Sequence, residues 1–172
     1  MFNAPRDVNG VGIALATSED WERVRDVRVR ALADAPFAYG SRLEEEHDQP
    51  ESFWRARLER HAEATFLAID RHGTVGLVRT FVAPEDVTTA ELVSMWVAPH
   101  ARGQAVGRQL VAAVVEWARD RDAATVQLWV TETNAAARRL YELCGFVLSG
   151  GRQSLPSDPL LSEVAMQLVL RY

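Results

Sequence analysis

The chain has 172 residues, of which 48% are hydrophobic and 25% charged, and its net charge is −5. This length and composition predict one soluble globular domain. The negative charge argues against nucleic acid or an anionic membrane as a partner. The single cysteine, Cys144, excludes an internal disulfide and a cysteine-based zinc site. No apolar run is long enough to span a bilayer, and residues 1–9 are interpreted as a flexible lead-in, so the expected location is cytoplasmic.

The N-terminal third of the chain predicts one strand followed by two helices. The apolar run at residues 10–17 is typical of a strand. Thr17, with Asp20 three residues later, predicts the capped start of a helix, whose apolar residues continue at helical spacing to Leu32. Pro50 marks the expected start of the second helix.

The rest of the chain alternates between strands and helices. Strands are expected at residues 65–70, 74–83, 88–99, 124–132, 146–150 and 162–172, with a loop at 151–159 before the last one. An amphipathic helix is expected from residue 106 to about 120. Another begins near Asn134 and ends at Gly145, which suits a left-handed C-terminal cap. The order β-α-α-β-β-β-α-β-α-β-β predicts a single α/β (α+β) domain over residues 10–172, with a mixed sheet flanked by helices.

The stretch VAPHARGQAVGRQL, residues 97–110, places a glycine-bearing loop between a strand and a helix. The first N–H groups of a helix lack internal partners, and the helix dipole favours an anion there, so the loop is a candidate phosphate site. A tight turn that needs glycines for its own dihedral angles explains the loop equally well. A P-loop and a dinucleotide fingerprint are excluded, because the glycine spacing differs and the chain has no lysine.

This loop and the later stretch NAAARRLYELCGF together resemble the acetyl-CoA-binding core of the GNAT superfamily of N-acetyltransferases. The family loop is [Q/R]-x-x-G-x-[G/A] after a Val-x-Pro strand end, and Arg102 and Gly107 fill its first and last positions, whereas Ala105 replaces the middle glycine. The downstream motif N-x-x-A-x-x-L-Y-x-x-x-G-F matches throughout, at Asn134, Ala137, Leu140, Tyr141, Gly145 and Phe146. The resemblance covers about residues 10–171 and implies a mostly antiparallel sheet.

The resemblance implies acetyl-CoA as co-substrate, and the four histidines form no metal-ligand pattern. Backbone N–H groups of the loop and the helix start would hold the pyrophosphate, with Arg102 and Arg108 as charged supports. The preceding strand would pair with the pantetheine arm, and the Val97 N–H would polarise the thioester carbonyl. The implied cofactor-binding residues are Met95, Trp96, Val97, Arg102, Gly103, Gln104, Ala105, Val106, Gly107, Arg108, Asn134 and Tyr141.

The implied reaction is direct attack of a neutral primary amine on the thioester in a ternary complex, without a covalent enzyme intermediate. Tyr141 would act as general acid on the departing thiolate. Glu91 aligns with the general base of some relatives, but a strand-edge charge facing solvent, or a proton relay through water, are alternatives. Cys144, on the apolar stripe of its helix, is interpreted as buried filler. The alternative function is a non-catalytic acyl-CoA-binding sensor.

The acceptor is expected to be an amine-bearing small molecule or a peptide, and a homodimer is a candidate assembly. By resemblance, the first two helices, the loop between them and the last strand pair would cover the acceptor. An acidic cluster in that region either attracts a cationic amine such as a polyamine or is a solvated acidic face. This cluster comprises Glu44, Glu45, Glu46 and Asp48.

Overall fold

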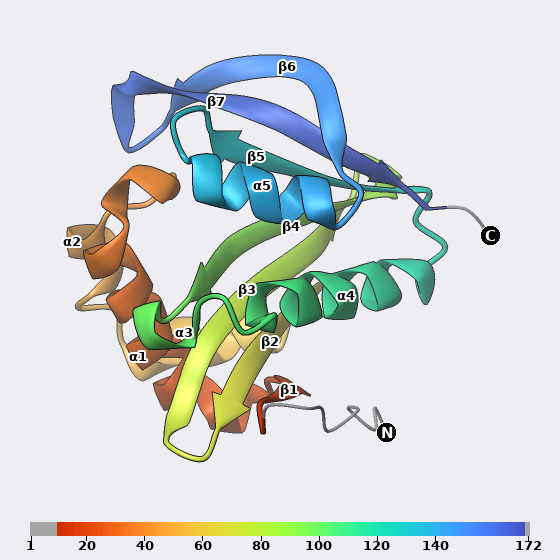
Figure 1. Cartoon of the computed structure of the whole chain (residues 1–172). Coiled ribbons are helices and arrows are strands. Elements are labelled where there is room, and N and C mark those ends of the chain that lie inside the picture. Colours follow the sequence, from red (N-terminus) through yellow and green to blue (C-terminus); the bar gives the residue numbers. More distant parts are fainter. Residues whose placement is uncertain (1–9, 171–172) are drawn as a thin grey trace.

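The structure, a computed structural model, describes residues 10–170, so the expected lead-in at 1–9 and the end of the last expected strand lie outside the described residues. Seven strands form one sheet in the order β1-β2-β3-β4-β5-β7-β6 (Figure 1). Only the β4–β5 pair is parallel, which confirms a mixed, mostly antiparallel sheet. The strands are β1 (Gly12–Leu15), β2 (Glu63–Asp70), β3 (Gly73–Ala83), β4 (Asp86–Val97), β5 (Thr125–Thr131), β6 (Val147–Leu155) and β7 (Asp158–Val169).

Helices cover both faces of the sheet. They are α1 (Trp21–Asp34), α2 (Leu43–Glu46), α3 (Glu51–Leu58), α4 (Val106–Arg119) and α5 (Ala135–Leu143). On β3, Gly76 faces Leu110 of α4, whereas the next residue, Leu77, is paired with Trp96, whose indole N–H donates to Asp34 at the end of α1. Because neighbouring strand residues point to opposite faces, α1 and α4 lie on opposite sides of the sheet. The expected element order is confirmed, with the short α2 added.

Two predicted helix signals are found in the structure. The Thr17 backbone N–H donates to the Asp20 carboxylate at 3.0 Å, although this first turn is a 3-10 turn and α1 begins only at Trp21. Gly145 has φ 91°, the left-handed conformation expected after α5. These short-range motifs depend on neighbouring residues, which is why the sequence alone locates them well.

The expected loop at residues 151–159 is wrong, because most of it is strand. β6 continues to Leu155 and β7 begins at Asp158, so only a tight turn separates them. Gly150 and Gly151 lie where the register with β7 shifts, between Leu148 and Arg152, and Gly150 has φ 92° there. A bulge in a strand accommodates a glycine at positive φ without ending the strand.

The strands β4 and β5 part from each other halfway along their length. Their pairing covers only Thr89–Glu91 against Thr125–Gln127, although both strands continue beyond it. β4 carries a bulge just after this point, where Ser94 has φ 58° and the register with β3 shifts. A bulge bends the strand and increases its twist, so β4 stays paired with β3 while its other edge separates from β5. The loop to α4 follows directly at the end of β4 (Figure 1).

The backbone of Ala105 yields a stability prediction. Ala105 precedes α4 with φ 64° and ψ 4°, a left-handed conformation that costs a residue with a Cβ roughly 1–2 kcal/mol. Ala105→Gly removes this cost but adds unfolded-chain entropy of about 0.4–1 kcal/mol, so we expect a net stabilisation of about 1 kcal/mol. Urea unfolding measures it. The matched control is Ala112→Gly, at an exposed position within α4, which should destabilise by about 1 kcal/mol. Destabilisation by both changes would contradict the assignment of strain to Ala105.

Candidate functional site

The free edge of β4 presents backbone polar groups toward the space between β4 and β5. The Ala98 N–H donates to the Val75 carbonyl at 2.8 Å, so Ala98 faces β3 and the adjacent Val97 faces away from it. Two carbonyls on this edge accept side-chain donors. The Met95 carbonyl accepts the Tyr39 hydroxyl at 2.9 Å, and the Val97 carbonyl accepts the Arg102 Nε at 3.0 Å. The Val97 N–H has no partner in β3, and pairing with β5 has already ended there.

The loop before α4 presents a row of backbone donors. Gly103 and Ala105 both have positive φ. Gln109 is the first residue of α4 whose backbone N–H binds a carbonyl of this loop, and it donates to the Ala105 carbonyl at 3.1 Å. Within the described residues, no backbone acceptor is found for the N–H groups from Gly103 to Arg108. Unpaired N–H groups at a helix start, next to a loop of positive φ, form a concave site for an anion. The residues present therefore fit a pyrophosphate.

The charged residues of the loop differ in their availability. Arg102 is an ion-pair partner of Asp34 at the end of α1 and also holds the Val97 carbonyl, so its guanidinium ties the loop to the sheet and α1. Arg108 is exposed and forms no ion pair with a described residue. Of the two expected charged supports, Arg108 is the one left available for a phosphate. Gly107 has a separate packing reason to be glycine, because an added Cβ would lie 2.9 Å from the Leu140 side chain on α5.

Tyr141 lies on α5 and is only 5% exposed. Its ring packs against Phe146, with ring centroids 5.8 Å apart. Its hydroxyl forms no hydrogen bond with a described residue, yet is not among the buried atoms sealed from solvent. Burial, together with Tyr39 and Cys144 nearby, raises the pKa of Tyr141, so the hydroxyl keeps its proton at neutral pH. Asn134 caps α5, since its side-chain oxygen accepts the Ala137 N–H at 3.2 Å, and its amide nitrogen stays available.

Glu91 is the last residue of β4 that is paired with β5, opposite Gln127. It is half-buried on an interior strand, which excludes a strand-edge position, and it accepts a hydrogen bond from the Gln127 amide at 3.3 Å. Burial, with a smaller contribution from Asp86, raises the pKa of the Glu91 carboxyl. Glu91 pairs with Phe81 and Val93 with Arg79, so these side chains share the α1 face. No described contact joins Glu91 to Tyr141.

Two residues of this region have no role in the sequence-based prediction. Tyr39 is buried and lies at the free edge of β4 through its hydroxyl, and the Ser157 hydroxyl donates to its carbonyl. Glu163 on β7 is 7% exposed, and its carboxylate accepts the Gln153 amide at 3.0 Å. Tyr39 lies in an irregular segment three residues after Pro36, and Glu163 lies in the mostly apolar strand β7. Neither local pattern distinguishes such a residue from ordinary packing, so only the tertiary structure reveals them.

The expected acidic cluster does not form one surface. Glu46 is buried and bound by arginines, and Glu45 accepts the Arg42 backbone N–H at 2.9 Å. Glu44 and Asp48 are exposed, and Asp48 contacts His47. The cluster is therefore neither a single cation-attracting patch nor a uniformly solvated face.

Residues 10–170 contain neither a metal-binding cluster nor a membrane-spanning helix. No group of three or more His, Cys, Asp or Glu side chains in this range could hold a metal ion. None of its helices is long and apolar enough to cross a membrane. Cys144, at the C-terminal cap of α5, is a free, half-buried cysteine, and burial raises the pKa of its thiol, which makes it a poor nucleophile.

An open strand edge beside a helix start with unpaired N–H groups suits an extended ligand that carries phosphate. Residues 21–146 match the Acetyltransferase (GNAT) family. The chain is 34% identical over 143 residues to a mycothiol acetyltransferase of Thermobispora bispora, covering 78% of this chain and 46% of that protein. It is 28% identical over 109 residues to a putative ribosomal protein bS18 alanine N-acetyltransferase of Bacillus subtilis, covering 63% of this chain and 70% of that protein. It also spans 66% of an uncharacterised N-acetyltransferase, YhfO, of B. subtilis, at 28% identity over 56% of this chain.

Solved structures agree on the fold. The spermidine N-acetyltransferase from Vibrio cholerae, solved with CoA and spermine, has a TM-score of 0.75 at 18% identity, covering 94% of this chain and 96% of that one. A nourseothricin acetyltransferase has a TM-score of 0.60 at 28% identity, covering 64% and 67% of the two chains. The chain belongs to the GNAT acetyltransferase family. It spans about half to two-thirds of the length of the first curated relatives that it matches.

Proposed function

We propose that this protein is an acetyl-CoA-dependent N-acetyltransferase that acetylates a primary amine by direct attack in a ternary complex. The observation that carries this proposal is the Tyr141 hydroxyl, which is protonated, unpaired among the described residues and placed on the helix that follows the parted strand β5. A protein that only senses acyl-CoA has no need of a buried proton donor there. Related proteins are named N-acetyltransferases, which supports the same reaction class.

The residues around the parted strands supply a binding site for acetyl-CoA. The N–H groups from Gly103 to Arg108 would hold the pyrophosphate, with the Arg108 guanidinium as a charged support. Met95 and Val97 on the free edge of β4 would pair with the pantetheine arm, and the Asn134 amide nitrogen is a further donor for it. When bound, acetyl-CoA supplies the thioester that is the acetyl donor.

The Val97 N–H is the group that would stabilise negative charge on the reacting carbonyl oxygen. It is a backbone donor on a strand held by β3 and by the Arg102 contact to its own carbonyl, so it is fixed before the reaction. Preorganised donors of this kind cost no reorganisation during the reaction. Tyr141 would donate its proton to the departing thiolate, and Glu91, through water, would receive the proton of the amine.

The first test changes only the acid. Tyr141→Phe keeps the ring that packs on Phe146, so the fold and acetyl-CoA affinity should change little. Loss of the proton donor should lower kcat by about 10² to 10⁴, with a small change in the acetyl-CoA KM, the pattern of an interaction made mainly in the transition state. Steady-state thiol release with the best amine from a panel measures this, with calorimetric CoA affinity and melting temperature as controls. Turnover within about twofold of the parent would remove Tyr141 as the acid. Acetyl-CoA binding by the parent without thiol release for any amine would favour the sensor.

The second test concerns the base. The parent's kcat/KM should rise with pH through the raised pKa of Glu91, because only the carboxylate accepts a proton. Glu91→Gln should therefore lose most activity at moderate pH and approach the parent at high pH, where the amine loses its proton unaided. A pH profile of both proteins measures it, and Glu85→Gln, at an exposed position in the β3–β4 turn, is the matched control. An equal loss at every pH would assign Glu91 a structural role instead.

A further inference from the structure

The acidic residue that is buried in the expected acidic cluster, Glu46, belongs to a larger charged group on the α1 face of the sheet. Arg28 of α1 binds the Glu46 carboxylate with Nε at 3.2 Å and Nη2 at 3.0 Å, and Arg57 of α3 adds a third contact at 3.3 Å. Arg79 of β3 binds Glu63 of β2 at 2.8 Å. We call these five side chains the arginine cluster. Their charges influence one another, since, in addition to burial, Arg79 and Arg28 both lower the pKa of Arg57, and Arg28 also lowers the pKa of Arg79.

The arginine cluster has more positive than negative charge, and all of it is largely buried. The side chains are exposed by 5% for Arg28, 16% for Arg57, 15% for Arg79, 6% for Glu46 and 18% for Glu63. Three buried guanidinium groups therefore face two carboxylates, and the exposed Arg60 adds a fourth guanidinium at Glu63, 3.0 Å away. Burial, followed by repulsion from a neighbouring arginine, lowers the pKa of Arg57, which is the direction expected where positive charge is in excess.

The hydrogen bonds of the arginine cluster are also incomplete. Arg28 Nη1 and Arg79 Nε are buried and have no partner among the described residues. A buried donor without a partner and a buried charge without a counter-charge are each costly, so native proteins rarely keep them. An anion beside Arg57 and Arg79 would reduce both costs, because it would supply one negative charge and an acceptor next to Arg79.

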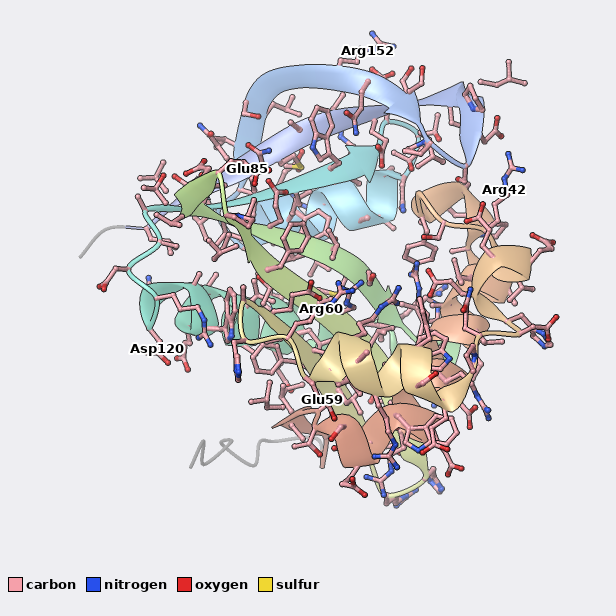
Figure 2. All side chains as sticks on the ribbon, turned by 180° about the vertical axis from the view of Figure 1, so that it is seen from behind. Arg42, Glu59, Arg60, Glu85, Asp120 and Arg152 are labelled. Atoms are coloured by element: carbon pink, nitrogen blue, oxygen red, sulfur yellow. The ribbon has the colours of Figure 1, made fainter. Side chains whose placement is uncertain are left out.

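The arginine cluster lies directly behind the part of β4 that forms the candidate site. Arg79 is paired with Val93, next to the bulge at Ser94. The Arg28 guanidinium lies 4.8 Å from the centre of the Tyr39 ring, and the Tyr39 hydroxyl binds the Met95 carbonyl. Figure 2, turned by 180° from Figure 1, brings this face of the sheet toward the viewer. The unpaired N–H groups before α4 lie at the other face, where α4 packs, so an acceptor would approach the thioester from the cluster's side.

We propose that the arginine cluster binds an anionic group of the acceptor, so that the preferred substrates are amines that also carry a carboxylate, such as amino acids. This inference rests on the proposed acetyltransferase function. It adds a negatively charged group to the acceptor, whereas one interpretation of the acidic residues 44–48 in the sequence is attraction of a purely cationic amine such as a polyamine. Arg57 and Arg79 keep some solvent exposure and are the members that would contact the carboxylate, while Arg28 supports them through Glu46 and Tyr39.

The test compares each amino acid with its own primary amide, for tyrosine, methionine and arginine. The two members of a pair have the same size and amine position, and differ in the charge of one group. The amide has the less basic amine, so more of it is unprotonated at neutral pH, and this bias acts against the prediction. We expect kcat/KM to be at least about tenfold higher for the acids, the size of one charge-assisted hydrogen bond. Arg79→Gln should bring the acid-to-amide ratio close to one without changing the acetyl-CoA KM.

The controls separate this inference from the proposed function. Arg119→Gln, at an exposed position at the end of α4 next to Asp120, labelled in Figure 2, should leave the ratio unchanged. If the Arg79→Gln protein folds poorly, the acid-to-amide ratio of kcat/KM for Arg57→Gln tests the same inference. Acetylation of the amides at least as fast as the acids overturns the inference but leaves the acetyltransferase function intact. If no amine is acetylated, the proposed acetyltransferase function fails. The carboxylate-binding inference is then tested by the melting temperature of the CoA-bound protein with each ligand. A higher melting temperature with the acids alone supports carboxylate binding by the arginine cluster. Stabilisation by acetate or by the amides that equals stabilisation by the acids overturns it, and so does no stabilisation by either the acids or the amides.

Discussion

The site depends on the backbone groups that β4 leaves unpaired when it separates from β5. Pairing between the two strands ends at Glu91 and Gln127, and the bulge at Ser94 follows. Every backbone polar group beyond that point needs another partner, since buried N–H and C=O groups are rarely left without one. Side chains from distant parts of the chain serve the carbonyls, namely Tyr39 at Met95 and Arg102 at Val97. The N–H groups remain for a ligand.

The same constraint explains why segments far apart in sequence meet here. The Thr131 hydroxyl at the end of β5 donates to the Phe37 carbonyl at 2.6 Å, and the Arg42 guanidinium binds the Ser157 carbonyl between β6 and β7. Together with the Tyr39 contact to Met95 of β4, these bonds attach the segment after α1 to both sides of the parted strands. A site held by such contacts is fixed in shape before a ligand arrives, which lowers the entropic cost of binding. Its two faces differ in chemistry, with backbone donors and Arg108 on one and the arginine cluster on the other.

The sequence predicts the fold and the family better than it predicts which charges meet around the candidate site. The element order and Gly145 as a helix cap follow from local periodicity and turn chemistry, and the structure confirms them. The motif around Arg102 and Tyr141 identifies the family because two linked patterns are specific together. What sequence cannot provide is which charges meet in space. Arg102 pairs with Asp34, and Glu46 with Arg28, over long separations along the chain, so residues 44–48 alone do not reveal the arginines that surround Glu46.

The central claim is that coenzyme A lies along the free edge of β4 and on the N–H groups before α4. Backbone amide NMR of the protein with and without coenzyme A tests it most directly, because each N–H reports its own hydrogen bond. We expect large shifts and slowed hydrogen exchange at Val97 and from Gly103 to Arg108, while the amides of β1 stay unchanged. Saturating binding of coenzyme A with no response at Val97 and the loop would contradict it.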